Sequence, residues 1–111
     1  EIGPFAFAEC NLEKVYIAPS VKRIHYAAFL NSKNLYSVHL PEGLKVIESE
    51  TFSGCKNLSL VNTGLPESVT EIGANAFYKC SGLTSVTIGG SVTSIGGGAF
   101  EGCDSLDIGK R

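Results

Sequence analysis

The chain has 111 residues, a formal net charge of −2 and 43% hydrophobic residues, a balance typical of one soluble domain. It contains no apolar run long enough to cross a bilayer, and no basic stripe is visible in the sequence. The composition therefore predicts neither membrane insertion nor nucleic-acid binding.

An internal repeat of about 23 residues runs through the whole chain. Each repeat has an isoleucine five residues before a phenylalanine, and a leucine five or six residues after it. Such a period predicts stacked units, because one unit is too small to bury its own apolar side chains. We expect a single domain, 1–111, that is a fragment of a longer array. Its repeats are approximately 2–23, 24–46, 47–71, 72–94 and a partial 95–111, marked by Phe7, Phe29, Phe52, Phe77 and Phe100.

The first element of each repeat surrounds the phenylalanine, as in residues 76–80. The stretch Ala-Phe-x-x-Cys is too short for a full helix and too irregular for a strand. We therefore predict a single helical or 3₁₀ turn here. Equivalent phenylalanines should stack on one another and form a continuous buried column.

The second element is a strand, for which residues 83–88 are the clearest example. Val86 lies on the inner face by the period of two, whereas Ser85 and Thr87 face outward. Proline or a Gly-Gly pair then ends the strand and turns the chain. A second short extended piece follows, as in residues 92–95.

This shared pattern resembles the BspA-like leucine-rich repeats of the Treponema pallidum type. The strand signature, the corner Pro-x-x-Val-Thr-x-Ile-Gly and the turn Ala-Phe-x-x-Cys carry the resemblance, with the best copies at 69–80 and 92–103. The resemblance implies an α/β-type leucine-rich-repeat solenoid, a right-handed coil of about 4.5 turns with a parallel sheet on its concave face. Members of the family are largely surface or secreted proteins of bacteria and some protists, and are associated with adhesion.

The four cysteines all stand three residues after a repeat phenylalanine, and a serine takes this place in the second repeat. We interpret the position as a buried column of free thiols, because free cysteine packs as a small apolar side chain. Zinc would need paired ligands at short spacing, which are absent from the sequence. A disulfide between neighbouring repeats stays open, although stacked side chains have poor geometry for it. The column consists of Cys10, Ser32, Cys55, Cys80 and Cys103.

Neither histidine has a partner at catalytic spacing. His25 takes the place of a corner glycine, and His39 should face outward on the sheet between Val38 and Leu40. The carboxylates are scattered over the turns, and no phosphate-binding glycine motif occurs. The sequence therefore predicts no catalytic, cofactor-binding or metal-binding residue, no cofactor, and a chain that is not an enzyme.

The outward positions of the predicted strands are the candidate protein-binding residues on the concave face. Tyr16, His39 and Leu60 make this strip more aromatic and apolar than exposure to solvent requires, and tyrosine is favoured at protein interfaces. The plainer interpretation is the outer face that every sheet has. The candidates are Lys14, Tyr16, Ser37, His39, Leu60, Asn62, Ser85 and Thr87.

Two irregular regions interrupt the pattern. The third repeat has two extra residues near 62–64, which form either a loop on the binding face or a neutral insertion. In the last repeat, Gly109 stands where valine is expected and Ile108 comes one residue early, so we expect the strand to lose register there. Neither end carries a polar capping repeat, which predicts weak end-to-end self-association or a segment of a longer array.

The sequence thus favours a non-enzymatic protein-binding or adhesion module. The expected partner is a host, matrix or other cell-surface protein, with no nucleic acid and no direct membrane insertion. The expected location, inferred from the family resemblance, is extracellular or at the cell surface. The alternative is a structural spacer or display scaffold that has no ligand of its own.

Overall fold

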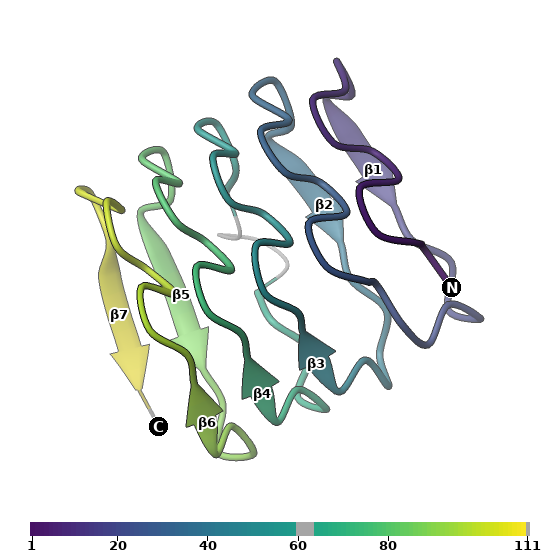
Figure 1. Ribbon diagram of the computed structural model, residues 1–111. Coiled ribbons are helices and arrows are strands. Elements are labelled where there is room, and N and C mark those ends of the chain that lie inside the picture. The colour runs from purple at the N-terminus through teal and green to yellow at the C-terminus, as the bar shows by residue number, and fades with distance from the viewer. Residues whose placement is uncertain (60–63, 111) are drawn as a thin grey trace.

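The computed structural model describes residues 1–59 and 64–110 (Figure 1). These residues form short strands joined by turns. The strands are short because a proline or glycine corner ends each of them after a few residues. The strands are β1 (Lys14–Tyr16), β2 (Ser37–His39), β3 (Val46–Ile47), β4 (Glu71–Ile72), β5 (Ser85–Ile88), β6 (Ser94–Ile95) and β7 (Asp107–Lys110).

All the strand pairs are parallel, because successive repeats run in the same direction. β1 pairs with β2 and β5 pairs with β7, and their partners lie about one repeat apart in the sequence. The predicted second extended pieces form a separate sheet in the order β3-β4-β6. Figure 1 shows two rows of strands that both run along the stack, one with β1, β2, β5 and β7 and the other with β3, β4 and β6. The two chain ends lie at opposite ends of the stack.

The predicted phenylalanine column is confirmed. Centroids of neighbouring rings lie 5.3–5.5 Å apart, and the ring planes are within 16° of parallel. The three inner rings, Phe29, Phe52 and Phe77, are completely buried. Isoleucine, leucine and valine from the same repeats pack around them in one continuous core.

The stretch around each phenylalanine is not helical, so the prediction of a helical or 3₁₀ turn is wrong. Backbone N–H groups alternate between two kinds of acceptor. Leu30 donates to Ala27 three residues earlier, as in a 3₁₀ turn, whereas Phe29 donates to Thr51 in the next repeat. A 3₁₀ helix would use every N–H within its own turn. The hydrogen bonds between repeats therefore take half of the donors that a helix would need.

This alternation depends on left-handed backbone at two positions, two residues before and two residues after each repeat phenylalanine. The φ angles there lie between 56° and 80° in every repeat. Most of these residues are not glycine, although left-handed backbone costs other residues about 1–2 kcal/mol. The inter-repeat hydrogen bonds offset that cost. The positions are Phe5, Glu9, Ala27, Asn31, Glu50, Gly54, Asn75, Lys79, Gly98 and Gly102.

In the last repeat the register shifts by one residue, as the sequence predicts, but the strand pairing continues. β7 pairs with β5 in parallel, with Ile108 opposite Val86 and Gly109 opposite Thr87. The repeat is one residue shorter than its predecessor between Leu106 and Ile108. The turn before β7 absorbs this missing residue, and the pairing continues.

The cysteine column is present, and all four cysteines are free. The Cys55 thiol donates to the carbonyl oxygen of Phe29 in the preceding repeat at 3.1 Å. Ser32 makes the equivalent hydrogen bond to Phe7 at 2.7 Å. Burial raises the pKa of Cys55 to about 12, which keeps this thiol protonated and unreactive.

Candidate functional site

An exposed aromatic pair lies on the outer face of β1 and β2. Tyr16 is directly opposite His39, and their rings stack with centroids 4.7 Å apart and planes only 2° from parallel. Tyr16 is 69% exposed. The alternation of the strand causes this placement, because Val15 and Val38 between the outward residues turn toward the core. The structure thus joins two of the candidate residues in one exposed surface.

A cation–aromatic contact lies beside this pair. Lys14 pairs with Ser37, and its Nζ is 5.9 Å from the centroid of the Tyr36 ring. Tyr36 is 42% exposed and was not among the residues predicted from the sequence. The prediction from strand alternation did not include Tyr36, because this residue immediately precedes β2. An aromatic residue directly before a strand was the available signal.

The remaining candidates are not joined to this surface in the described sheets. Ser85 and Thr87 are exposed on β5, which pairs with β7. Leu60 and Asn62, and with them most of the two-residue insertion, lie outside the described residues. Tyr16, His39, Lys14 and Ser37 with the added Tyr36 therefore form the candidate surface, which we call the β1–β2 face.

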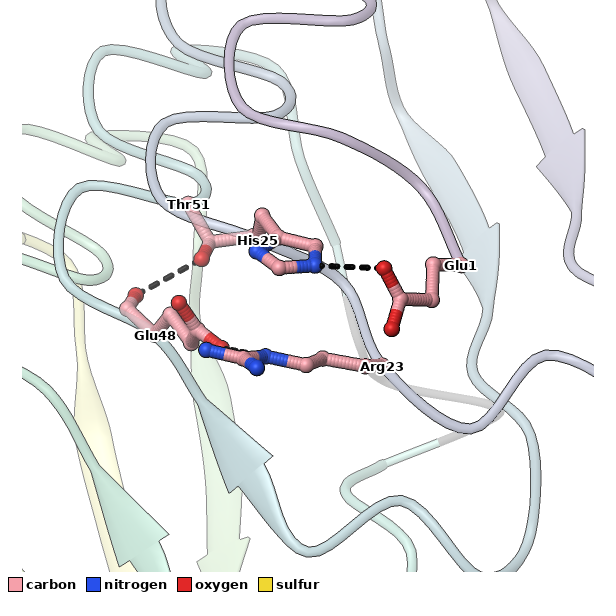
Figure 2. Close-up of polar contacts among 5 residues, drawn as sticks. All are labelled: Glu1, Arg23, His25, Glu48 and Thr51. Carbon is pink, nitrogen blue, oxygen red and sulfur yellow. Dashed lines mark hydrogen bonds and ion pairs between the residues drawn. The ribbon is translucent and has the colours of Figure 1, made fainter.

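A polar cluster occupies the corner before the phenylalanine turns, where His25 and Glu48 replace the glycine of other repeats (Figure 2). His25 Nε2 lies 3.0 Å from Glu1 Oε1, and Arg23 Nε donates to Glu48 Oε2 at 2.8 Å. The hydrogen bond with His25 lowers the pKa of Glu1, and the hydrogen bond with Glu48 raises the pKa of Arg23. His25, which replaces a corner glycine, is thus a half-buried partner of a carboxylate.

A shallow depression of about 580 Å³ lies next to this cluster. Its lining mixes cations such as Lys22 and Lys45 with the carboxylates of Glu48 and Glu71. The Arg23–Glu48 ion pair is already formed within it. The depression therefore has three cations against two carboxylates, an excess of only one positive charge.

The described residues give no support for chemistry at a metal ion. Within 1–59 and 64–110, no three His, Cys, Asp or Glu side chains are placed to hold a metal ion together. In the same part of the chain, no helix has the length and apolarity that crossing a membrane requires.

Parallel strands stacked at this repeat length define a leucine-rich-repeat protein. The chain matches the family described as "BspA type Leucine rich repeat region", in six copies, over residues 1–108. It belongs to this family. The phenylalanine spacing marks five repeats in the same segment. No curated protein matches the chain.

Solved structures of bacterial proteins share this fold. A leucine-rich repeat protein from Bacteroides ovatus is 34% identical with a TM-score of 0.88 over 98% of this chain and 28% of its own. The T. pallidum leucine rich repeat protein is 33% identical with a TM-score of 0.88 over 95% of this chain and 49% of its own. A leucine rich cell surface protein from Faecalibacterium prausnitzii is 32% identical with a TM-score of 0.91 over 97% of this chain and 28% of its own. The chain thus spans less than half of each protein.

Proposed function

We propose that the chain is a non-enzymatic protein-binding segment of a cell-surface or secreted adhesion protein. Its repeats would form about 4.5 turns of a right-handed solenoid, with the ligand on the concave strand face. Family membership supports this proposal, and so does a similar structure described as a leucine rich cell surface protein. The partner in this proposal is a host, matrix or other cell-surface protein.

The stacked pair of Tyr16 and His39 is the observation that carries the proposal. Tyrosine contributes apolar area and a hydrogen-bonding hydroxyl, and it loses little entropy on binding because it has few rotatable bonds. Here the ring is also held by a neighbouring ring on a sheet, so part of the ordering is complete before a ligand arrives. Lys14 and Tyr36 add a cation and a second exposed ring beside it.

The test compares two aromatic pairs of the same chain. The double variant Tyr16→Ala/His39→Ala removes the stacked pair of the β1–β2 face. The control Phe5→Ala/Tyr26→Ala removes an exposed pair elsewhere, whose rings meet edge to face at 5.4 Å. Binding to immobilised fibronectin, laminin and collagen and to fixed host cells would be measured by interferometry or cell adhesion.

We expect the first variant to weaken binding by about tenfold or more, because central aromatic residues dominate interface energies. The control should bind within about twofold of the parent. Equal losses in both variants would place the ligand away from the β1–β2 face. If the parent binds none of these proteins or cells, the spacer interpretation replaces the proposal.

A further inference from the structure

Three lysines from successive repeats lie together along one edge of the stack. Lys33 and Lys56 occupy the same position, four residues after the phenylalanine of the second and third repeats. Lys79 comes from the fourth repeat, and all three side chains are exposed. They line a single groove of about 350 Å³, which we call the lysine groove.

Side chains of the preceding repeat lie across two glycines of the lysine groove. A Cβ on Gly54 would collide with Asn31 Oδ1, and a Cβ on Gly102 would lie 2.8 Å from Lys79 Cγ. The amide of Asn31 and the stem of Lys79 therefore lie across these two glycines. The two glycines therefore allow the repeats to approach closely here, and Asn31 and Lys79 belong to the lining of the groove.

The charge of the groove is strongly one-sided although the chain as a whole is acidic. Asp104 is the carboxylate that lines it, and within the described residues none of the three lysines forms an ion pair. The phenylalanines of the repeats that carry Lys33 and Lys56 are 5.4 Å apart, so the backbone positions of the two lysines lie about one repeat step from each other. Like charges at this spacing repel one another, and an anion bound between them would remove that repulsion.

The sequence did not reveal this feature. Lys33 and Lys56 are 23 residues apart, and no stretch of sequence looks basic. Stacking of the repeats converts the long sequence spacing into a row. The sequence itself has no basic stripe, and the lysine groove becomes apparent only when the repeats are stacked.

We propose that the lysine groove binds a linear acidic polysaccharide. The row crosses successive repeats and therefore suits a polymer whose anionic groups recur along its length. Asn31 and Ser81 add neutral hydrogen-bonding groups of the kind that sugar hydroxyls need. The apolar surface of the lining belongs to the stems of polar side chains and to backbone, and the lining holds no aromatic ring on which a nucleic-acid base could stack.

The shared chemistry of the ligand is a carboxylate or sulfate group on a sugar chain, and the two sources are separable by experiment. Heparin supplies sulfates together with carboxylates, polygalacturonate supplies carboxylates alone, and dextran is the uncharged control. Binding would be measured by titration calorimetry with the whole 111-residue chain at low and at physiological salt. We expect binding of one or both acidic polymers, weakening as salt rises, and no binding of dextran.

The chain offers a closely matched control. Lys33→Gln/Lys56→Gln removes two charges from the groove. Lys22→Gln/Lys45→Gln removes two exposed lysines that are also 23 residues apart, but that line the mixed-charge depression at the corner. We expect the first variant to bind at least about tenfold more weakly and the second to stay within about twofold of the parent. Unchanged melting temperatures would show that both variants remain folded.

A gain-of-function variant makes the test independent of any loss of folding. Ser81 occupies in the fourth repeat the position that Lys33 and Lys56 occupy in theirs, so Ser81→Lys extends the row. We expect about three- to fivefold tighter binding from the added charge.

Three outcomes would overturn the proposal. The first is equal weakening in both double variants, and the second is no binding of either acidic polymer by the parent at low salt. The third is tighter binding of single-stranded DNA of matched charge, with the same dependence on Lys33 and Lys56, which would assign the groove to nucleic acid. None of these outcomes bears on the β1–β2 face, because the groove and that face share no residue.

Discussion

At the residue scale, the position three residues after each repeat phenylalanine requires a small side chain that donates a hydrogen bond. Cys55, Cys80 and Cys103 each donate to a phenylalanine carbonyl one repeat earlier at 3.0–3.1 Å. Ser32 does the same at 2.7 Å and is equally buried. A thiol and a hydroxyl are therefore interchangeable in geometry, and they differ in acidity.

This difference predicts a stability effect at alkaline pH for Cys55→Ser. The Cys55 thiol has a pKa of about 12 when folded, against an ordinary 9.0. Above pH 9 the unfolded chain loses this proton while the folded chain keeps it, so stability is complete below pH 9 and falls between pH 9 and 12. The parent should lose about 1.4 kcal/mol relative to Cys55→Ser on going from neutral pH to about pH 10.

Urea unfolding of both proteins at a series of pH values measures this difference. The other titrating groups are common to both proteins, so the comparison isolates Cys55. The hydrogen bond with the neighbouring Cys103 thiol, together with burial, also raises the pKa of Cys80, so some alkaline sensitivity should remain in the variant. Parallel pH profiles for the two proteins would show that Cys55 is not protected by folding.

At the element scale, the corner that precedes each phenylalanine turn exists in two forms. In the fourth and fifth repeats it holds Gly73 and Gly96, and a Cβ on either would be forced against the backbone of the preceding repeat. In the second and third repeats it holds His25 and Glu48, which form the polar contacts of Figure 2. Close backbone packing at two of the corners is thus replaced by polar side-chain contacts at the other two.

Two adjacent glycines separate the effect of this packing from that of glycine itself. A Cβ on Gly96 would collide with the backbone nitrogen of Ala74, whereas a Cβ on Gly97 would meet nothing within 4 Å. Neither residue has a positive φ. We expect Gly96→Ala to destabilise the fold by about 1–3 kcal/mol through overpacking. Gly97→Ala should be neutral or slightly stabilising, because alanine restricts the unfolded chain.

Chemical unfolding midpoints of the two alanine variants check this expectation. If both variants lose the same stability, the cost comes from replacing glycine in this turn and not from contact with Ala74. If Gly96→Ala is neutral, the repeats must separate easily at this corner.

The sequence predicts those features of the elements that are set by regularly spaced apolar residues, and it does not predict the others. The outward direction of Tyr16 and His39 and the column of phenylalanines follow from spacing alone, because burial selects one face. The backbone of the turns does not follow, because it is set by N–H groups that donate to the next repeat. Left-handed Ala27 and Lys79 carry no sequence signal for that conformation.

The same limit applies to the candidate surfaces. Tyr36 lies just before β2, so the inward and outward alternation of strand residues does not predict its position. It nevertheless contributes a ring to the β1–β2 face. The lysine groove is assembled from residues about one repeat apart. Proximity of this kind becomes visible only when the repeats are placed on one another.

At the scale of the whole molecule, each repeat contacts its neighbours, and the phenylalanine column couples the stability of one repeat to that of the next. Phe77 is fully buried and stacks on Phe52 and Phe100. Phe7 stacks on Phe29 alone and is 36% exposed. An inner ring therefore couples two parts of the chain, whereas the first ring closes one end of the described column.

We expect Phe77→Ala to cost about 3–5 kcal/mol, which is much of the stability of a domain of this size. Phe7→Ala should cost about 1–2 kcal/mol, because less apolar surface leaves the core. Urea unfolding measures both costs, and hydrogen exchange locates them. In Phe77→Ala, exchange should accelerate most in β5, β6 and β7, because the cavity separates them from the repeats before it. A Phe77→Ala protein that melts within about 2 °C of the parent would mean that the column does not hold the repeats together.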